Sequence, residues 1–267
     1  MLSFGESFGA WVLATAIPAF VGITIVTYVG KVVRPRYVAA FALGIFFWFF
    51  VDTIEGSSDL LVNFGFTGGI DQVAIVALFA IGVLSLFYID STLRGGGLFS
   101  GQALGGAWPI VPILAALAVG IHGLGEGTAF GSTAALTSST DLLDAFGGTS
   151  AGVAYALHKM LEPMMVAALY VAYSQTEGAS KKQLRDIVIL TLLFVLPSIV
   201  GAVTGYFINY DATYFFGLGT GTSIYAAFRL ASQTFGEKSP ERVESLKVAL
   251  ALVAGFILIY FAALFHS

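Results

Sequence analysis

The sequence predicts an all-α integral membrane protein, with eight transmembrane helices in one compact bundle. Hydrophobic residues make up 57% of its 267 residues and charged residues only 10%, whereas a soluble domain carries about 25% charged residues. Apolar runs of about 20 residues, the length that crosses a bilayer as a helix, recur along the chain. The linkers between them are short, so we expect one transmembrane domain over residues 1–267 and no soluble module.

Eight apolar runs are the candidate spans. They lie near residues 8–30, 37–56, 72–92, 107–135, 149–174, 185–208, 212–233 and 246–265. The N-terminal segment contains a glutamate and no basic residue before its apolar run, which is not the pattern of a cleaved signal peptide. The first span is therefore expected to stay in the protein.

Charged residues segregate between the two ends of these runs. Eleven of the twelve basic residues fall on one predicted side: Lys31, Arg34, Arg36, Arg94, Lys181, Lys182, Arg185, Arg229, Lys238, Arg242 and Lys247. Acids fall on the other: Glu6, Asp52, Glu55, Asp59, Asp71, Asp141, Asp144 and Asp211. Because basic residues favour the cytoplasmic side, we expect a multi-pass protein of the cell membrane with both termini outside. No basic patch suggests a nucleic-acid partner, so the lipid bilayer is the expected surrounding.

Two of the three histidines lie in the predicted membrane region, each four residues before a glutamate. His122 and Glu126 belong to the run near 107–135, and His158 and Glu162 to the next. Residues four apart share one face of a helix, and ionisable side chains inside a bilayer are usually functional. The twelfth basic residue, Lys159, lies in the same region.

Two imidazoles and two carboxylates form a donor set that suits Zn²⁺, and also Fe²⁺ or Mn²⁺. The chain has no cysteine, so thiolate ligands are excluded. A His–Glu network that only ties two helices together is the structural alternative. The glycines around His122 favour close helix packing, and Pro163 favours a bend with a freed carbonyl at Lys159.

Other classes of protein also fit parts of the sequence. His122 and His158 could be axial ligands of a haem, or the chain could be a structural subunit of a membrane complex. An enzyme is not expected, because the His-Glu-x-x-His helix of a metalloprotease is absent. Glycine-rich faces would permit a homodimer, although nothing in the sequence requires one.

Four motifs, in chain order, resemble the ZIP family of divalent metal-ion transporters. The segment HGLGEG at 122–127 is similar to the family's fourth-span signature, and HKMLEP at 158–163 to its fifth-span signature. PSIVGAVTG at 197–205 and GTSIY at 221–225 resemble its sixth- and seventh-span segments. The resemblance implies eight spans, both termini outside, transport of a divalent metal by alternating access, and a primary metal site at His122, Glu126, His158 and Glu162.

The chain departs from the family at a second metal site. The family's second-site ligands fall at Gly123, Lys159 and Leu196 here, none of which ligates a metal. We therefore expect a single-metal site, in which the Lys159 ammonium replaces the second metal and pairs with Glu126 or Glu162. Alternatively, Lys159 repels divalent cations, and the chain is a relative that does not transport.

The resemblance also implies how the spans divide and where ions enter. Spans one, four, five and six would form one bundle and spans two, three, seven and eight the other. Small residues would line the sliding surface between them: Gly201, Gly205, Gly217, Gly219 and Gly221. Asp52 and Glu55 could guide ions inward or be interfacial acids without a role. Arg229 is expected to extend its charge toward the inner surface as an anchor.

Overall fold

The structure is a computed structural model, and it describes residues 3–64, 70–94, 110–136, 143–176, 183–208, 211–236 and 242–264. Within these ranges the chain is helical throughout, without a strand. The helices are α1 (Phe4–Val29), α2 (Pro35–Phe64), α3 (Ile70–Arg94), α4 (Ile110–Leu136), α5 (Thr149–Leu161), α6 (Met164–Thr176), α7 (Gln183–Phe207), α8 (Thr213–Phe235) and α9 (Arg242–Ala263), with a short 3₁₀ turn, η1, at Asp144–Phe146. The all-α prediction is confirmed.

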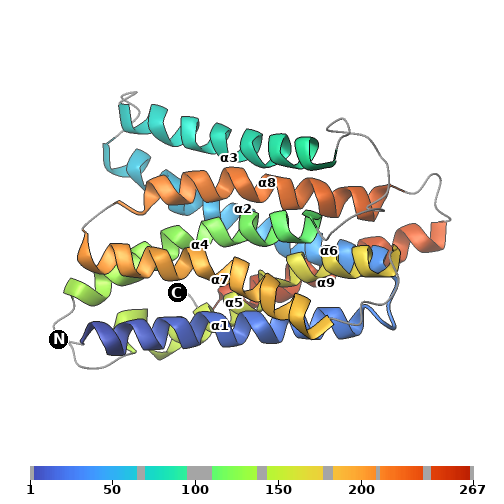
Figure 1. Cartoon of the computed structure of the whole chain (residues 1–267), viewed down its shortest axis with the longest axis horizontal. Coiled ribbons are helices and arrows are strands. Elements are labelled where there is room, and N and C mark those ends of the chain that lie inside the picture. Colours follow the sequence, from blue (N-terminus) through green and yellow to red (C-terminus); the bar gives the residue numbers. More distant parts are fainter. Residues whose placement is uncertain are drawn as a thin grey trace.

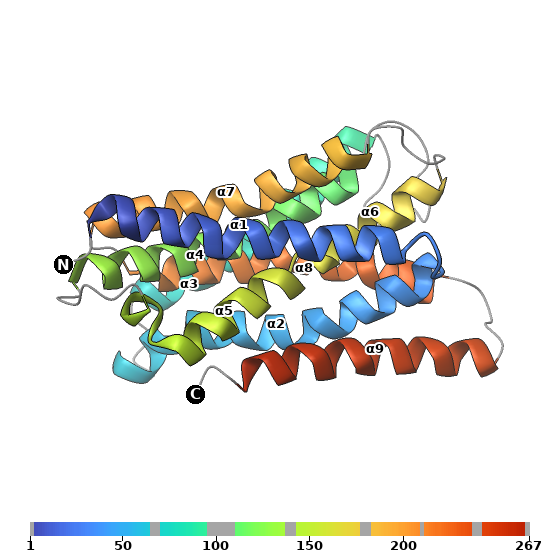
Figure 2. The same ribbon diagram turned by 90° about the horizontal axis from the view of Figure 1, so that it is seen from below.

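Among the described residues, six helices are long and apolar enough to cross a membrane: α1, α2, α3, α4, α7 and α9. Each needs about 18–20 such residues to span the hydrocarbon layer. Figures 1 and 2 show that direction alternates along the chain when α5 and α6 are taken together and α8 is included, and that α1 begins and α9 ends toward the same end of the bundle. The protein is therefore a multi-pass membrane protein.

The predicted fifth span is divided into two helices at Glu162 and Pro163. Proline has no amide hydrogen and its ring crowds the preceding turn, so α5 ends at Leu161 and α6 begins at Met164. The two helices follow one another in the same general direction (Figure 2). This interruption confirms the bend expected from Pro163, and it places Glu162 at the C-terminal end of α5.

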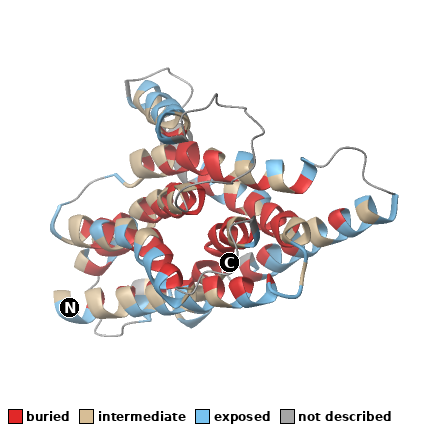
Figure 3. Ribbon diagram, turned by 45° about the vertical axis from the view of Figure 1, so that its right-hand side comes forward, coloured by how far each residue is buried: buried red, intermediate tan, exposed pale blue. Residues whose placement is uncertain are grey.

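The predicted division of the spans would place α1, α4, α5, α6 and α7 in one group and α2, α3, α8 and α9 in the other. The helices separate in this way only in part, because α8 packs as extensively on α4 as on α2 and α3. One group joins α4 to α7 and α1 to α5, α6 and α7, and the other joins α2 to α8 and α9, and α3 to α8. Figure 1 places α3 at the edge of the bundle beside α8. Buried residues concentrate on the surfaces where helices face each other (Figure 3). The main contact between the groups is α4 on α8.

The prediction for the glycine-lined sliding surface is wrong at four of its five positions. Gly201 and Gly205 lie against the backbone of α4, inside the first group. Gly217 and Gly221 lie against α3, inside the second group. Of the five, only Gly219 faces the other group, where an added Cβ would lie against the His122 backbone. Most of these glycines thus bring neighbouring helices into close contact within a group.

Candidate metal centre

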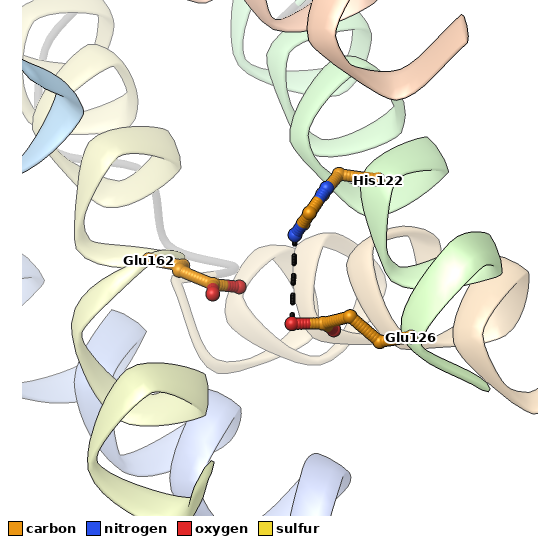
Figure 4. A group of neighbouring side chains, drawn as sticks. All are labelled: His122, Glu126 and Glu162. Carbon is orange, nitrogen blue, oxygen red and sulfur yellow. Dashed lines mark ion pairs between the residues drawn. The ribbon is translucent and has the colours of Figure 1, made fainter. Parts of the chain in front are cut away.

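Three of the four predicted ligands converge inside the bundle. His122 and Glu126 extend from α4 and Glu162 from the break after α5, and Figure 4 shows the three side chains pointing toward one another. One ligand atom from each lies within 4.8 Å of the others. The His122 Nε2 atom is 3.5 Å from a Glu126 carboxylate oxygen. The helical spacing of four residues places this pair on one face, as the sequence predicts.

Lys159 completes the cluster with a positive charge. Its ammonium forms ion pairs with both Glu126 and Glu162, the latter at 2.6 Å. Only 1% of the lysine side chain is exposed. The predicted pairing with one glutamate or the other is therefore observed with both at once. A buried ammonium needs such partners, since an uncompensated charge in a low-dielectric interior is strongly unfavourable.

His158 is near this cluster without belonging to its compact group. It is buried, and it lines the same cavity as His122 and Glu126. The close triad comprises His122, Glu126 and Glu162. A metal ligated by all four predicted residues would therefore require a rearrangement of α5.

The cavity has a volume of about 580 Å³ and reaches the cluster from one end of the bundle. Asp52 and Glu55, which are exposed, line it together with the buried His122 and His158. The cavity therefore runs from the surface to the buried centre. The two acids predicted at an entrance do line this route.

The His122 ring is held between aromatic side chains. The Phe49 ring lies 4.9 Å from it, edge to face, and the Phe216 ring lies 5.2 Å away. Behind it, a Cβ at Gly219 would approach the His122 α-carbon to 2.5 Å. Neither ring nitrogen of His122 makes a hydrogen bond, although the side chain is 1% exposed. A buried imidazole in this condition is a ready ligand or hydrogen-bond acceptor.

Beyond the cluster, α8 packs closely against its neighbouring helices. The Thr222 hydroxyl of α8 donates to the Ala118 carbonyl of α4 at 2.8 Å. One turn further, Tyr225 is fully buried against Leu114 and Leu86. These contacts pack α8 against α4 and α3 beyond the cluster.

A second buried ion pair was not predicted from the sequence. The guanidinium of Arg229 on α8 contacts the Asp90 carboxylate of α3, and it lies 5.4 Å from the Tyr225 ring centre. Asp90 is 2% exposed. Arg229 is thus not the surface anchor that was expected. The only signal in the sequence was Asp90, an acid near the end of an apolar run. Its pairing with Arg229 could not be predicted, since it depends on the contact between α3 and α8.

The fold and the cluster define a multi-pass membrane protein with an ionisable centre buried among its helices. Paired carboxylates with an imidazole can bind a cation. In the structure the two carboxylates already bind the ammonium of Lys159. No protein-family profile matches the chain, and no curated protein is similar enough to it to count as a relative. The likeness to ZIP transporters therefore depends on the motifs alone.

Proposed function

We propose that this protein carries a divalent metal cation across a membrane through a single site formed by His122, Glu126 and Glu162, with His158 as a further ligand. The convergence of these three side chains inside the bundle carries the proposal. One imidazole and two carboxylates suit Zn²⁺ best, and Fe²⁺ or Mn²⁺ are accepted by similar ligands. Ionisable groups at this depth commonly mark an ion pathway.

The cavity that leads from exposed acids to buried histidines supports transport by alternating access. Cations reach the site past Asp52 and Glu55, whose negative charges raise the local cation concentration. In the proposed cycle, the contacts of α8 with α4 would close the other side. Movement of one helix group against the other would open that side and close the first, and Gly219 lies at the contact between the groups.

The proposed topology has eight passes. The six apolar helices supply six of them, the consecutive α5 and α6 supply one, and α8 supplies the last. The α8 helix is less apolar because threonine, serine and glycine residues face the other helices. The distribution of basic residues then places both termini outside the cell membrane.

Lys159 must leave the carboxylates when a divalent metal binds. The two glutamates and the ammonium together carry one net negative charge. Adding a divalent ion would leave this buried cluster with a net positive charge, whereas displacing the ammonium would leave the metal and two carboxylates neutral. The lysine is therefore a competing cation, tethered to the site.

Metal content and metal titration of purified protein test the proposal. Elemental mass spectrometry gives the metal per chain, and calorimetry with Zn²⁺, Fe²⁺ and Mn²⁺ gives the affinities. We expect one metal per chain in the wild type and none in a His122→Ala, Glu162→Ala double variant. Glu6→Ala is the control, since it removes an exposed glutamate that does not line the cavity. Metal flux into liposomes then tests transport.

Absence of specific metal binding by the folded wild type would refute the proposal. The chain would then be a helical protein with an internal salt-bridged network, as in a relative that does not transport. A haem between His122 and His158 has less support. The His122 ring is bounded by Phe49 and Phe216 and directs a nitrogen toward Glu126, which leaves a small cation as the better-matched ligand.

A further inference from the structure

The cavity is much larger than a metal ion requires. Its volume of about 580 Å³ lies in the range of roughly 300–1,000 Å³ that is usual for small-molecule pockets. A metal ion alone would need only a narrow polar path. The size of the cavity therefore raises the question of a larger ligand.

The walls of the cavity combine aromatic rings with negative charge. Trp11, Phe130, Phe146 and Tyr155 form one stacked cluster along it, with the Trp11 ring centre 4.3 Å from that of Phe130 and 4.6 Å from that of Tyr155. The Trp11 Nε1 and the Tyr155 hydroxyl bond to Ser198 and Thr15, so their polar tips are already satisfied. The ring carbons are left to contact an apolar group.

The polar groups of the cavity match a positively charged head group. Asp52, Glu55 and Glu126 line it, whereas no lysine or arginine side chain does among the described residues. His122 adds buried ring nitrogens that make no hydrogen bond and that line the same space. An ammonium group can donate to both a carboxylate and an unprotonated imidazole.

The charge of the cluster favours a monovalent ligand while Lys159 stays in place. Glu126, Glu162 and the ammonium together leave one net negative charge, which one monovalent cation neutralises. The position of Lys159 also shows that this part of the protein accommodates an ammonium group. Its ammonium lies between two carboxylates, 5.6 Å from the ring centres of Tyr155 and Phe194, within cation–π distance.

We propose that the cavity binds a small organic ammonium ion of the primary-amine class. The ammonium group of the ligand contacts Glu126 and His122, and its short alkyl chain packs against Trp11 and Tyr155. This binding leaves the Lys159 ion pairs intact, in contrast to divalent metal binding, which displaces them. The amine site thus extends outward from the proposed metal site and shares Glu126 and His122 with it.

Trp11 itself provides the readout. The chain has three tryptophans, and replacing Trp48 and Trp108 with phenylalanine leaves Trp11 as the only one. The probe is n-butylammonium chloride, and n-butanol is the uncharged control of the same chain length. Potassium chloride controls for ionic strength. We expect a saturable change in Trp11 emission with butylammonium and none with butanol or potassium chloride.

Two variants in this background locate the ligand. Glu126→Gln removes the carboxylate and should weaken butylammonium binding at least tenfold. Ala151→Leu fills the cavity without changing any charge, and should weaken butylammonium binding to a similar extent. This variant keeps the test valid if Glu126→Gln does not fold. Ala156→Leu is its matched control, because Ala156 lies on the same helix α5 and does not line the cavity. It should bind butylammonium normally.

An unsaturable response, an equal response to butanol, or full binding by folded Ala151→Leu would overturn the amine site. Zn²⁺ titration of the same Trp11-only protein and its variants separates this result from the metal proposal. Metal binding that persists while butylammonium fails overturns the amine site alone. Saturable butylammonium binding without any metal binding upholds the amine site and refutes the metal proposal.

Discussion

Replacing Lys159 with methionine should strengthen divalent metal binding. Methionine keeps much of the length and the apolar stem of lysine and removes its charge. In the wild type, the ammonium holds both carboxylates that the metal needs. A metal must therefore break two ion pairs before it can bind, and the variant has none to break.

The geometry gives the scale of this effect. A metal about 2.1 Å from a Glu162 oxygen, which lies 2.6 Å from the ammonium, would be at most about 4.7 Å from that ammonium. At this separation, charges of +2 and +1 repel by roughly 7 kcal/mol at an effective dielectric constant of about 20. Movement of the lysine relieves much of this repulsion. We expect a gain of at least about tenfold in affinity, or about 1.4 kcal/mol.

Calorimetric titration with Zn²⁺ measures this gain, and thermal unfolding provides a second readout. Without metal, Lys159→Met removes the ammonium partner of the buried Glu162 and of the partly buried Glu126. Loss of one partner of a buried ion pair costs about 3–5 kcal/mol. Bound metal should restore much of this loss, so Tm rises more steeply with Zn²⁺ in the variant than in the wild type. Lys31→Met, which removes an exposed lysine, is the control. A folded Lys159→Met protein that binds Zn²⁺ no better than the wild type would refute the reasoning.

Three further predictions concern the same helices. Gly219→Ala places a methyl group against His122 and should weaken metal binding, since overpacking costs typically about 1–3 kcal/mol. Gly9→Ala is the control, because a Cβ there meets nothing within 4 Å. Equal metal affinities of the two variants in calorimetry would contradict the contact with His122. Metal affinity should fall on acidification, because carboxylates and imidazole bind metal only when unprotonated. Zn²⁺ titrations at about pH 7.5 and about pH 5.5 measure this change. Tighter binding at the lower pH would argue against these ligands. Arg229→Met should lower the free energy of unfolding by about 3–5 kcal/mol, and adding Asp90→Leu should restore most of the loss. Denaturant unfolding measures both changes. An Arg229→Met protein as stable as the wild type would show that the buried pair contributes little.

Local spacing was sufficient to predict part of the site. His122 and Glu126 share a helix face because residues four apart lie one turn apart, and the structure places their side chains 3.5 Å from each other. Pro163 predicted the interruption that separates α5 from α6, since proline cannot donate the helical hydrogen bond. Such features depend on neighbouring residues, which the sequence states directly.

Contacts between distant segments were not predictable in the same way. Four glycines assigned to a sliding surface pack inside a helix group, because a glycine in an apolar run shows that another backbone is close without showing which one. Arg229 was expected at the surface, and its pairing with Asp90 depends on the packing of α8 against α3. Sequence spacing also predicted that His158 would be a ligand like His122. In the structure the close triad comprises His122, Glu126 and Glu162, without His158.

The sequence by itself determined that this is a helical membrane protein with ionisable groups among its apolar residues. Composition and run length decide that, because the bilayer requires about 20 apolar residues per pass. Only the tertiary structure decided that one ammonium joins Glu126 and Glu162, that a cavity reaches Glu126, and that aromatic rings line it. These features arise where separate helices meet, and the packing of whole helices fixes those meeting points.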